Sequence, residues 1–270
     1  MSDERSAADS PADRWPVWAG PVGFGIAIVI TLLLGAIVVG IAIAVGTDAP
    51  EDAPAVALIG TLLQDFALIG TAVAFGSRYG RVRLGDFGLR PVSLRTAVLW
   101  TGAALLAFYV LSGLYTALVQ PDGEQDIVET LGVERGTGYL LATAFLVILV
   151  APVAEELFFR GFFYRSLRNR FPPFGAAAIV GLVFGAIHYT DADTLLLIPV
   201  LALLGIVFCL LYERTGSLYP AIAMHAINNT LALAAATDAA GAVPVSIAFG
   251  LVALGGCVAA PRLMPGRSRS

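Results

Sequence analysis

The sequence at residues 138–164 reads GYLLATAFLVILVAPVAEELFFRGFFY. Its first seventeen residues carry no charge, and three ionisable residues, Glu155, Glu156 and Arg160, follow within the same apolar run. A membrane-spanning helix needs about 20 apolar residues, because the hydrocarbon layer is roughly 30 Å thick and each helical residue rises about 1.5 Å. We therefore predict that residues 138–164 form a transmembrane helix with charged side chains inside it.

The rest of the chain is equally apolar. Hydrophobic residues make up 58% of the 270 residues, charged residues only 13%, and the mean hydropathy is +0.83. These values exclude an ordinary soluble domain and a disordered chain. We predict an all-α, polytopic membrane helical bundle of about eight transmembrane helices, at residues 21–46, 53–76, 96–119, 138–164, 174–190, 194–212, 218–236 and 241–260.

The loops between these runs are too short for a separate soluble domain. We expect a single membrane domain at residues 19–261, whose motif-bearing core is 138–236. A flexible cytoplasmic leader, 1–18, and a cytoplasmic tail, 262–270, flank it. The first apolar run follows a polar, acidic leader and is too long for a secretory signal peptide.

The arginines predict the orientation of the chain. All sixteen basic residues are Arg, and an N-terminus in the cytoplasm places fifteen of them on the cytoplasmic side, with only Arg135 outside. Cytoplasmic loops of membrane proteins are enriched in cations, so we predict that both termini are cytoplasmic in a multi-pass protein of the cell membrane. The net charge of −4 and the lack of a basic face argue against a nucleic-acid partner. The predicted outer loops are acidic and hold Asp48, Glu51, Asp52, Asp122, Glu124, Asp126, Glu129, Glu134, Asp191, Asp193 and Asp238.

A few polar residues fall inside the predicted spans. Burying such groups in a bilayer costs a few kcal/mol each, which makes them functional candidates. Both histidines of the chain are among them, whereas its two cysteines lack metal-ligand spacing. The candidates are Gln64, Asp65, Glu155, Glu156, Arg160, His188, His225, Asn228 and Asn229.

Helical spacing assigns different environments to the two adjacent glutamates. Glu156 and Arg160 are four residues apart, so they share a helix face and can neutralise one another. Glu155 is then left without an ionic partner in apolar surroundings, which suits it to proton transfer. The alternative is a helix end whose charged side chains reach toward the cytoplasmic head groups.

The two histidines lie in other predicted spans. Phe184 and His188 share a face with Gly181 and Gly185, which would admit another helix at close range. The alternative for this face is simple packing with an incidental histidine.

His225 and Asn229 are likewise one turn apart, and the alternative for this pair is a hydrogen bond between helices. Counted from the cytoplasmic edge, Glu155, His188, His225 and Asn229 lie roughly 10–21 Å deep, so they can meet in the inner half of the bilayer.

Such a constellation suits the hydrolysis of a peptide bond. A carboxylate and an imidazole can bind and deprotonate a water, and a second imidazole and a carboxamide can donate hydrogen bonds to the resulting oxyanion. The same groups offer a second possibility, because Glu155, His188 and His225 form the ligand set of many catalytic zinc sites.

The three motifs, Glu155-Glu156-x-x-x-Arg160, Phe184-x-x-x-His188 and His225-x-x-x-Asn229, resemble those of the CPBP family. These intramembrane proteases process CAAX tails or bacteriocins, are also called the Abi family, and include the type II CAAX prenyl endopeptidases. The resemblance covers about residues 138–236. It implies that Glu155 and His188 activate the water and that His225 and Asn229 stabilise the oxyanion.

By the same resemblance, Glu156, Arg160 and Phe184 would support the site. The family is described both as metalloproteases and as metal-free glutamate proteases. We favour a metal-free site, because a zinc site would leave Asn229 less explained, and zinc remains the second option. The implied partners are the lipid bilayer and a membrane-associated substrate, either a prenylated C-terminal tail or a peptide leader.

Two other functions compete with the protease. A non-catalytic immunity or scaffold protein of the same fold would not need Glu155 together with both histidines. A proton-coupled transporter could use Asp65, Glu155 and the histidines as a relay, but it would need a polar path across the whole membrane.

Overall fold

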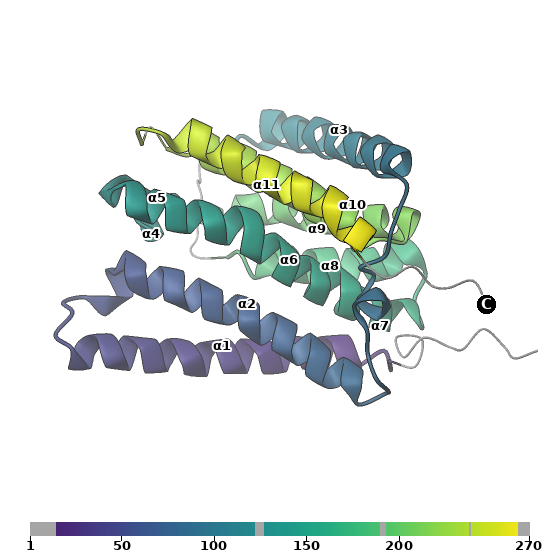
Figure 1. Ribbon diagram of the computed structural model, residues 1–270, viewed down its shortest axis with the longest axis horizontal. Helices are drawn as coiled ribbons and strands as arrows, with labels where there is room; N and C mark the ends of the chain where they lie inside the picture. The colour runs from purple at the N-terminus through teal and green to yellow at the C-terminus, as the bar shows by residue number, and fades with distance from the viewer. Residues whose placement is uncertain (1–14, 122–126, 190–192, 238, 264–270) are drawn as a thin grey trace, which may run out of the picture.

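The computed structural model describes residues 15–121, 127–189, 193–237 and 239–263, and within them the chain forms only helices and turns (Figure 1). The main helices are α1 (Ala19–Ala44), α2 (Pro54–Ser77), α3 (Leu94–Val119), a long rod over Thr137–Arg168, α8 (Pro173–Ala186), α9 (Ile198–Thr215), α10 (Leu218–Ala235) and α11 (Ala242–Leu263). Short helical segments connect them: η2 (Pro50–Asp52), η3 (Leu84–Phe87), α4 (Ile127–Thr130), η4 (Val133–Arg135) and η7 (Asp193–Leu197).

Each predicted span overlaps one of these eight main helices, which confirms the polytopic all-α bundle. Six of them are long and apolar enough to cross a membrane by themselves. The other two are α8, which has only 14 residues, and α10, which carries both amides and one of the two histidines. The two helices that fall short as independent spans thus contribute to two of the three candidate motifs, while the third motif lies on the rod.

The rod over Thr137–Arg168 is continuous but changes its winding. It consists of α5 (Thr137–Ala144), η5 (Phe145–Val150), α6 (Ala151–Glu155), η6 (Glu156–Tyr164) and α7 (Arg165–Arg168), and both η5 and η6 are π-helical. A π-helix has more residues in each turn and is often found at functional sites. Pro152 lies in the first turn of α6 and has no N–H to donate to the preceding turn. This missing donor accounts for the irregular backbone hydrogen bonding where η5 meets α6.

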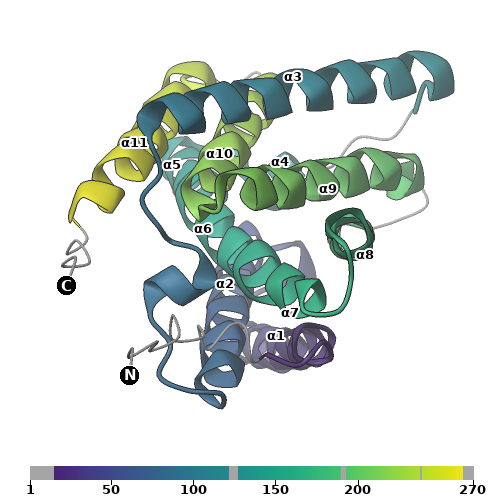
Figure 2. The same cartoon turned by 90° about the vertical axis from the view of Figure 1, so that its right-hand side faces the viewer.

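The rod lies at the centre of the bundle (Figure 1). On one side α1 and α2 run side by side, and α2 contacts the rod through α6 and both π-helices. On the other side α10 contacts η5, α6 and η6, while α8 packs along α9 and against η6 (Figure 2). The central rod therefore brings residues of α2, α8, α9 and α10 around Glu155–Arg160.

Aromatic side chains of η6 fill the core. Phe158, Phe159, Phe162 and Phe163 are buried and contact one another's rings or those of α1 and α8. Trp15 is also buried, and its ring centroid lies 5.2 Å from that of Phe162. The packed domain thus begins before the predicted boundary at residue 19, and α11 continues to Leu263, past the predicted boundary at residue 261.

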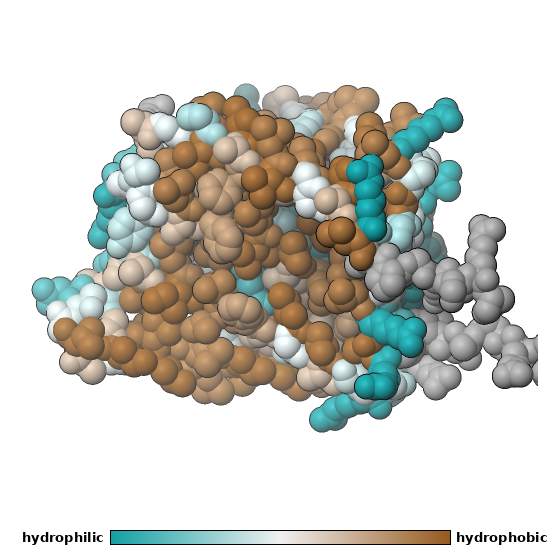
Figure 3. Space-filling model, in the orientation of Figure 1, coloured by the Kyte–Doolittle hydropathy of each residue, from teal (hydrophilic) through white to brown (hydrophobic). Residues whose placement is uncertain are grey.

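The surface divides into an apolar belt and two polar ends (Figure 3). Exposed leucines, isoleucines and valines of α1 and α3 form much of the belt, as expected where lipid replaces water. The beginning of α1 and the end of α11 lie at the same end of the molecule (Figure 1). This arrangement agrees with termini on one side of the membrane, and the identity of that side stays a prediction.

Part of what the sequence predicted lies outside the described residues. This applies to residues 1–14 of the leader, to residues 264–270 of the tail and to five of the predicted outer acids, Asp122, Glu124, Asp126, Asp191 and Asp238.

Candidate active site

A buried ion pair lies at the centre of the site. Nη1 of Arg160 donates a hydrogen bond of 2.8 Å to Oε1 of Glu156, and both side chains are 0% exposed. Nη2 of Arg160 donates to the backbone oxygen of Gly205 at 3.2 Å. The guanidinium also lies 4.6 Å from the ring centroid of Phe184 and 4.7 Å from that of Phe208. The predicted pairing is confirmed, and complete burial excludes side chains that reach out to head groups.

Glu156 also fixes the orientation of His225. Its Oε1 lies 3.0 Å from Nδ1 of His225. Because a carboxylate paired with arginine can only accept hydrogen bonds, Nδ1 carries the proton and donates it. The imidazole stacks on Phe208 with a centroid distance of 4.9 Å. The remaining nitrogen, Nε2, then points toward Glu155.

Among the described residues, Glu155 is the carboxylate of the Glu-Glu pair that has no arginine partner. Its Oε2 lies 4.0 Å from Nε2 of His225, and no residue in the described part of the chain hydrogen-bonds to this oxygen. The side chain is 12% exposed. This separation is too long for a direct hydrogen bond between the two atoms.

His188 lies just beyond its helix. The sequence predicts a helix to residue 190, but α8 ends at Ala186 and His188 follows in a turn. Its Nδ1 lies 2.7 Å from the backbone oxygen of Phe184, so Nδ1–H donates and Nε2 is free to accept a proton. Its ring packs against that of Phe184 at 4.9 Å, and Phe184 lies 6.2 Å from His225. Phe184 therefore links the two imidazoles, whereas no hydrogen bond or ion pair within the described ranges joins His188 to Glu155.

Asn229 faces the same rod as His225, as its spacing predicts. Its Nδ2 donates to the backbone oxygen of Val147 in η5 at 2.8 Å. This bond uses one of the two N–H groups of the amide and leaves the other. Asn228 donates to Oδ1 of Asn229 at 3.4 Å and accepts at 3.2 Å from the hydroxyl of Tyr109 in α3.

The glycines of α8 allow the close packing that the sequence predicts. A methyl group on Gly181 would lie 2.7 Å from the backbone oxygen of Ala202, and one on Gly185 would lie 2.8 Å from that of Ile198. Both of these oxygens belong to α9, so the glycine face of α8 is pressed against α9. This contact positions Phe184 beside Arg160.

Asp65 lies on a helix that borders the site, although no motif includes it. Its side chain in the middle of α2 is 1% exposed, and α2 packs against α6, the helix that ends at Glu155. Its neighbour Gln64 is partly buried.

The zinc alternative requires three of the candidate side chains to converge on one point. A zinc site needs three protein ligands about 2.0–2.2 Å from one point. Glu155, His188 and His225 do not converge in this way, and neither does any other group of three such residues in the described ranges.

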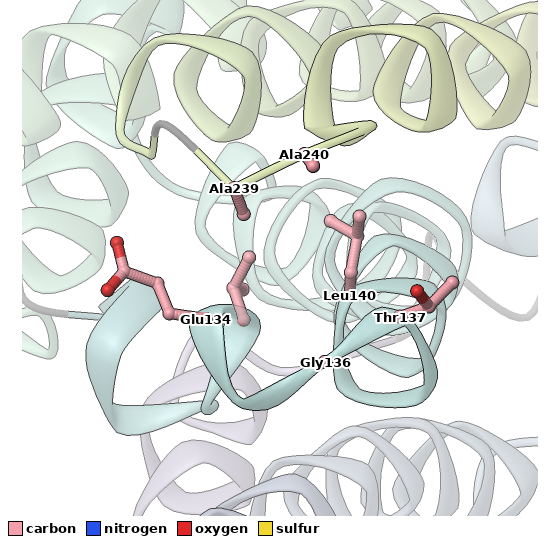
Figure 4. A pocket seen from close by; sticks show the side chains of 7 residues that line it. Glu134, Gly136, Thr137, Leu140, Ala239 and Ala240 are labelled. Carbon is pink, nitrogen blue, oxygen red and sulfur yellow. The ribbon is translucent and has the colours of Figure 1, made fainter.

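The structure also contains a pocket away from this site. A cavity of about 430 Å³ lies between the start of α5 and the turn before α11 (Figure 4). These segments lie at the end of the molecule opposite the beginning of α1 and the end of α11 (Figure 1). Glu134, Thr137, Leu140 and Ala239 line it, and it contains none of the candidate residues.

Sequence reasoning missed two contributors. Phe208 stacks on His225 and contacts Arg160, and Tyr109 holds Asn228 from a separate helix. Both are aromatic residues in apolar runs, so no local pattern marks them.

Comparison with known proteins gives one match. Residues 137–231 match the model of a family described as type II CAAX prenyl endopeptidase, Rce1-like. No curated protein and no solved structure matches the chain. The matched segment contains all three motifs and confirms the resemblance drawn from them, although the Abi and metalloprotease labels gain no support. Residues 137–231 are thus similar to the Rce1-like type II CAAX prenyl endopeptidases, and this similarity supports an intramembrane protease kind of function.

Proposed function

We propose that this protein is an intramembrane endopeptidase in which Glu155 and His188 activate a water and His225 and Asn229 stabilise the oxyanion. One observation carries the proposal. Glu155 has an unpartnered carboxylate oxygen 4.0 Å from Nε2 of His225, whose other nitrogen is held by a buried ion pair. A carboxylate kept free beside an oriented imidazole is a suitable general base.

In the proposed reaction, the water oxygen attacks the peptide carbonyl carbon and its proton passes to Glu155. The negative charge that develops on the carbonyl oxygen receives hydrogen bonds from Nε2–H of a protonated His225 and from the second N–H of Asn229. The C–N bond then breaks, and Glu155 returns the proton to the leaving amine. His188 would hold the water through its free Nε2.

Glu156 and Arg160 take a positioning role in this scheme. The carboxylate of Glu156 accepts from both Arg160 and His225, so it fixes the imidazole in the way that the aspartate of a serine-protease triad does. The Glu156–Arg160 pair has no net charge, which lowers the free-energy cost of burying it next to the reacting groups.

We propose that the reaction needs no metal ion. The three candidate ligands do not converge, and each has a role without one. Preincubation with a strong chelator should therefore leave the rate of peptide cleavage unchanged. Loss of activity that added zinc restores would contradict the metal-free mechanism.

The proposed substrate is a membrane-associated peptide, because the site lies within the apolar belt. A prenylated CAAX-type tail is the first candidate, since the matched family is named for it. A peptide leader that docks at the membrane is the second. We place the protein as a multi-pass protein of the cell membrane, with the site reached from the cytoplasmic side.

A farnesylated fluorogenic peptide with a CAAX tail tests the proposal on the purified protein in vesicles. Glu155→Gln, His188→Ala and His225→Ala should each lower kcat by about 10²–10⁴-fold, the usual contribution of general acid–base groups. Glu213→Gln, which alters an ion pair with Arg168 away from the site, should keep wild-type turnover. Wild-type turnover in any of the three site variants would exclude the role assigned to that residue.

A wild-type protein that cleaves no peptide would favour a non-catalytic protein of the same fold. Comparing membrane proteomes of cells with wild-type protein and with Glu155→Gln covers other substrates, because a protease variant should accumulate an uncleaved precursor.

A further inference from the structure

Asp65 is a buried carboxylate that the proposed reaction does not use. It is 1% exposed in the middle of α2, and neither of its carboxylate oxygens has a hydrogen-bond partner among the described residues. Burying an unpaired carboxylate costs several kcal/mol, so such groups inside membranes are usually functional.

Asp65 and Glu155 lie at the same level of the bundle. Asp65 is twelve residues from the inner end of α2 at Ser77, and Glu155 is thirteen residues from the end of the rod at Arg168. These offsets correspond to about 18 and 20 Å along the helices. Because α2 packs against α6, the two carboxylates are carried by helices in direct contact.

Within the described ranges, no arginine beside this pair of carboxylates is left to balance its charge. Arg160 of η6 is already bound to Glu156 and to Gly205. The other helices packed against α2 there, α1 and η5, carry no ionisable side chain, and the acids of η2 lie at the far end of α2. His225 of α10 faces Glu155, and the single charge of a protonated His225 can balance only one of the two carboxylates. Two adjacent carboxylates in a low dielectric cannot both ionise, as in the aspartic-protease dyad.

We propose that Asp65 shares one proton with Glu155 and so acts as a positioning residue for the general base. The pair then carries a single negative charge. The protonated member donates a charge-assisted hydrogen bond to the attacking water, and this water donates to the ionised member and holds it in place. This inference rests on the proposed function, since it assigns Asp65 to the same reaction.

Two substitutions separate proton sharing from mere packing. Asp65→Asn keeps the shape and an N–H donor, so kcat should stay within about threefold of wild type. Asp65→Val removes the donor, and kcat should fall by roughly 10–100-fold with KM within about twofold, because a misplaced catalytic group costs that much. Thr71→Val is the matched control, since Thr71 is another buried residue of α2 whose hydroxyl has no partner.

Infrared spectroscopy provides the second measurement. Wild-type protein should show the C=O stretching band of a buried protonated carboxylic acid at neutral pH. Asp65→Asn should lose this band, because the remaining Glu155 is ionised, and Thr71→Val should keep it.

Either of two results would overturn the inference. The first is a wild-type kcat for the Asp65→Val variant. The second is an Asp65→Asn variant whose kcat falls as far as that of Asp65→Val and whose infrared spectrum still shows the band of the protonated acid. If both Asp65 variants keep the wild-type kcat while Glu155→Gln is inactive, this inference alone is rejected. If Glu155→Gln is active, the proposed function itself is rejected.

Discussion

At the scale of single residues, Glu156 organises the site. One of its oxygens accepts hydrogen bonds from both Arg160 and His225, at 2.8 and 3.0 Å. The two neighbouring glutamates therefore have different roles, because Glu156 is paired with Arg160 and His225, whereas no arginine among the described residues pairs with Glu155. Removing one partner of a buried ion pair leaves the other charge uncompensated, which is more costly than losing an exposed pair.

We predict that Glu156→Gln destabilises the protein by about 3–5 kcal/mol, because it leaves Arg160 charged and buried. Glu213→Gln is the matched control, since the pair of Glu213 with Arg168 is 34% and 30% exposed, and it should cost at most about 1 kcal/mol. Unfolding of both variants in the same detergent measures the difference. Equal stabilities would show that burial of the pair has no energetic consequence.

The sequence predicts the local part of this arrangement and not the rest. The spacing of Glu156 and Arg160 implies their pairing, since both lie on one helix. The bond from His225 to Glu156 joins residues 69 positions apart, so it depends on how helices pack. The role of Asp65 depends on the same packing, and no motif reveals it.

At the scale of elements, the contact of α8 with α9 positions Phe184 against Arg160 and leads into His188. The glycines of α8 allow this approach, since Gly181 has no room for a methyl group beside the backbone of α9. Gly175, at the start of α8, has only the side chain of Pro172 and Phe171 nearby, at 3.6 Å or more.

Gly181→Ala should therefore destabilise the protein by about 1–3 kcal/mol, the usual cost of overpacking. It should also lower kcat, because α8 must shift and Phe184 moves with it. Gly175→Ala should be neutral or slightly stabilising, since alanine favours helix and the space is open. Thermal unfolding and peptide cleavage of both variants check this prediction, and a Gly181→Ala protein as stable and active as Gly175→Ala would contradict it.

Two features of the helices are not predicted by the sequence. Helical spacing identifies the glycine face of α8, but His188 lies in a turn after the helix rather than within it. The π-helices of the rod are not predicted either. Pro152 accounts for the break after η5, and we find no comparable residue that explains η6.

At the scale of the whole molecule, the apolar belt encloses a small polar centre. All eight predicted spans appear as helices, because apolar run length alone is a strong signal in membrane proteins. The short α8 and the polar α10 are stable only through their neighbours, which a local hydropathy pattern cannot show. The direction of the bundle in the membrane rests on the arginines.

We predict that the loop after α2 is cytoplasmic and that η4 faces outside. In a background with Cys209→Ala and Cys257→Ala, Arg81→Cys should be protected from a membrane-impermeant maleimide in intact cells. Glu134→Cys should be labelled, because residue 134 is exposed at the other end of the molecule. The opposite labelling pattern would reverse the proposed topology and the cytoplasmic access of the site.

The turnover of Glu155→Gln on a farnesylated CAAX peptide tests the central claim most directly. The protein should keep its wild-type unfolding temperature, because Glu155 makes no ion pair with Arg160, and its kcat should fall by about 10²–10⁴-fold. Wild-type kcat in this variant would contradict the assignment of Glu155 as the base that activates water.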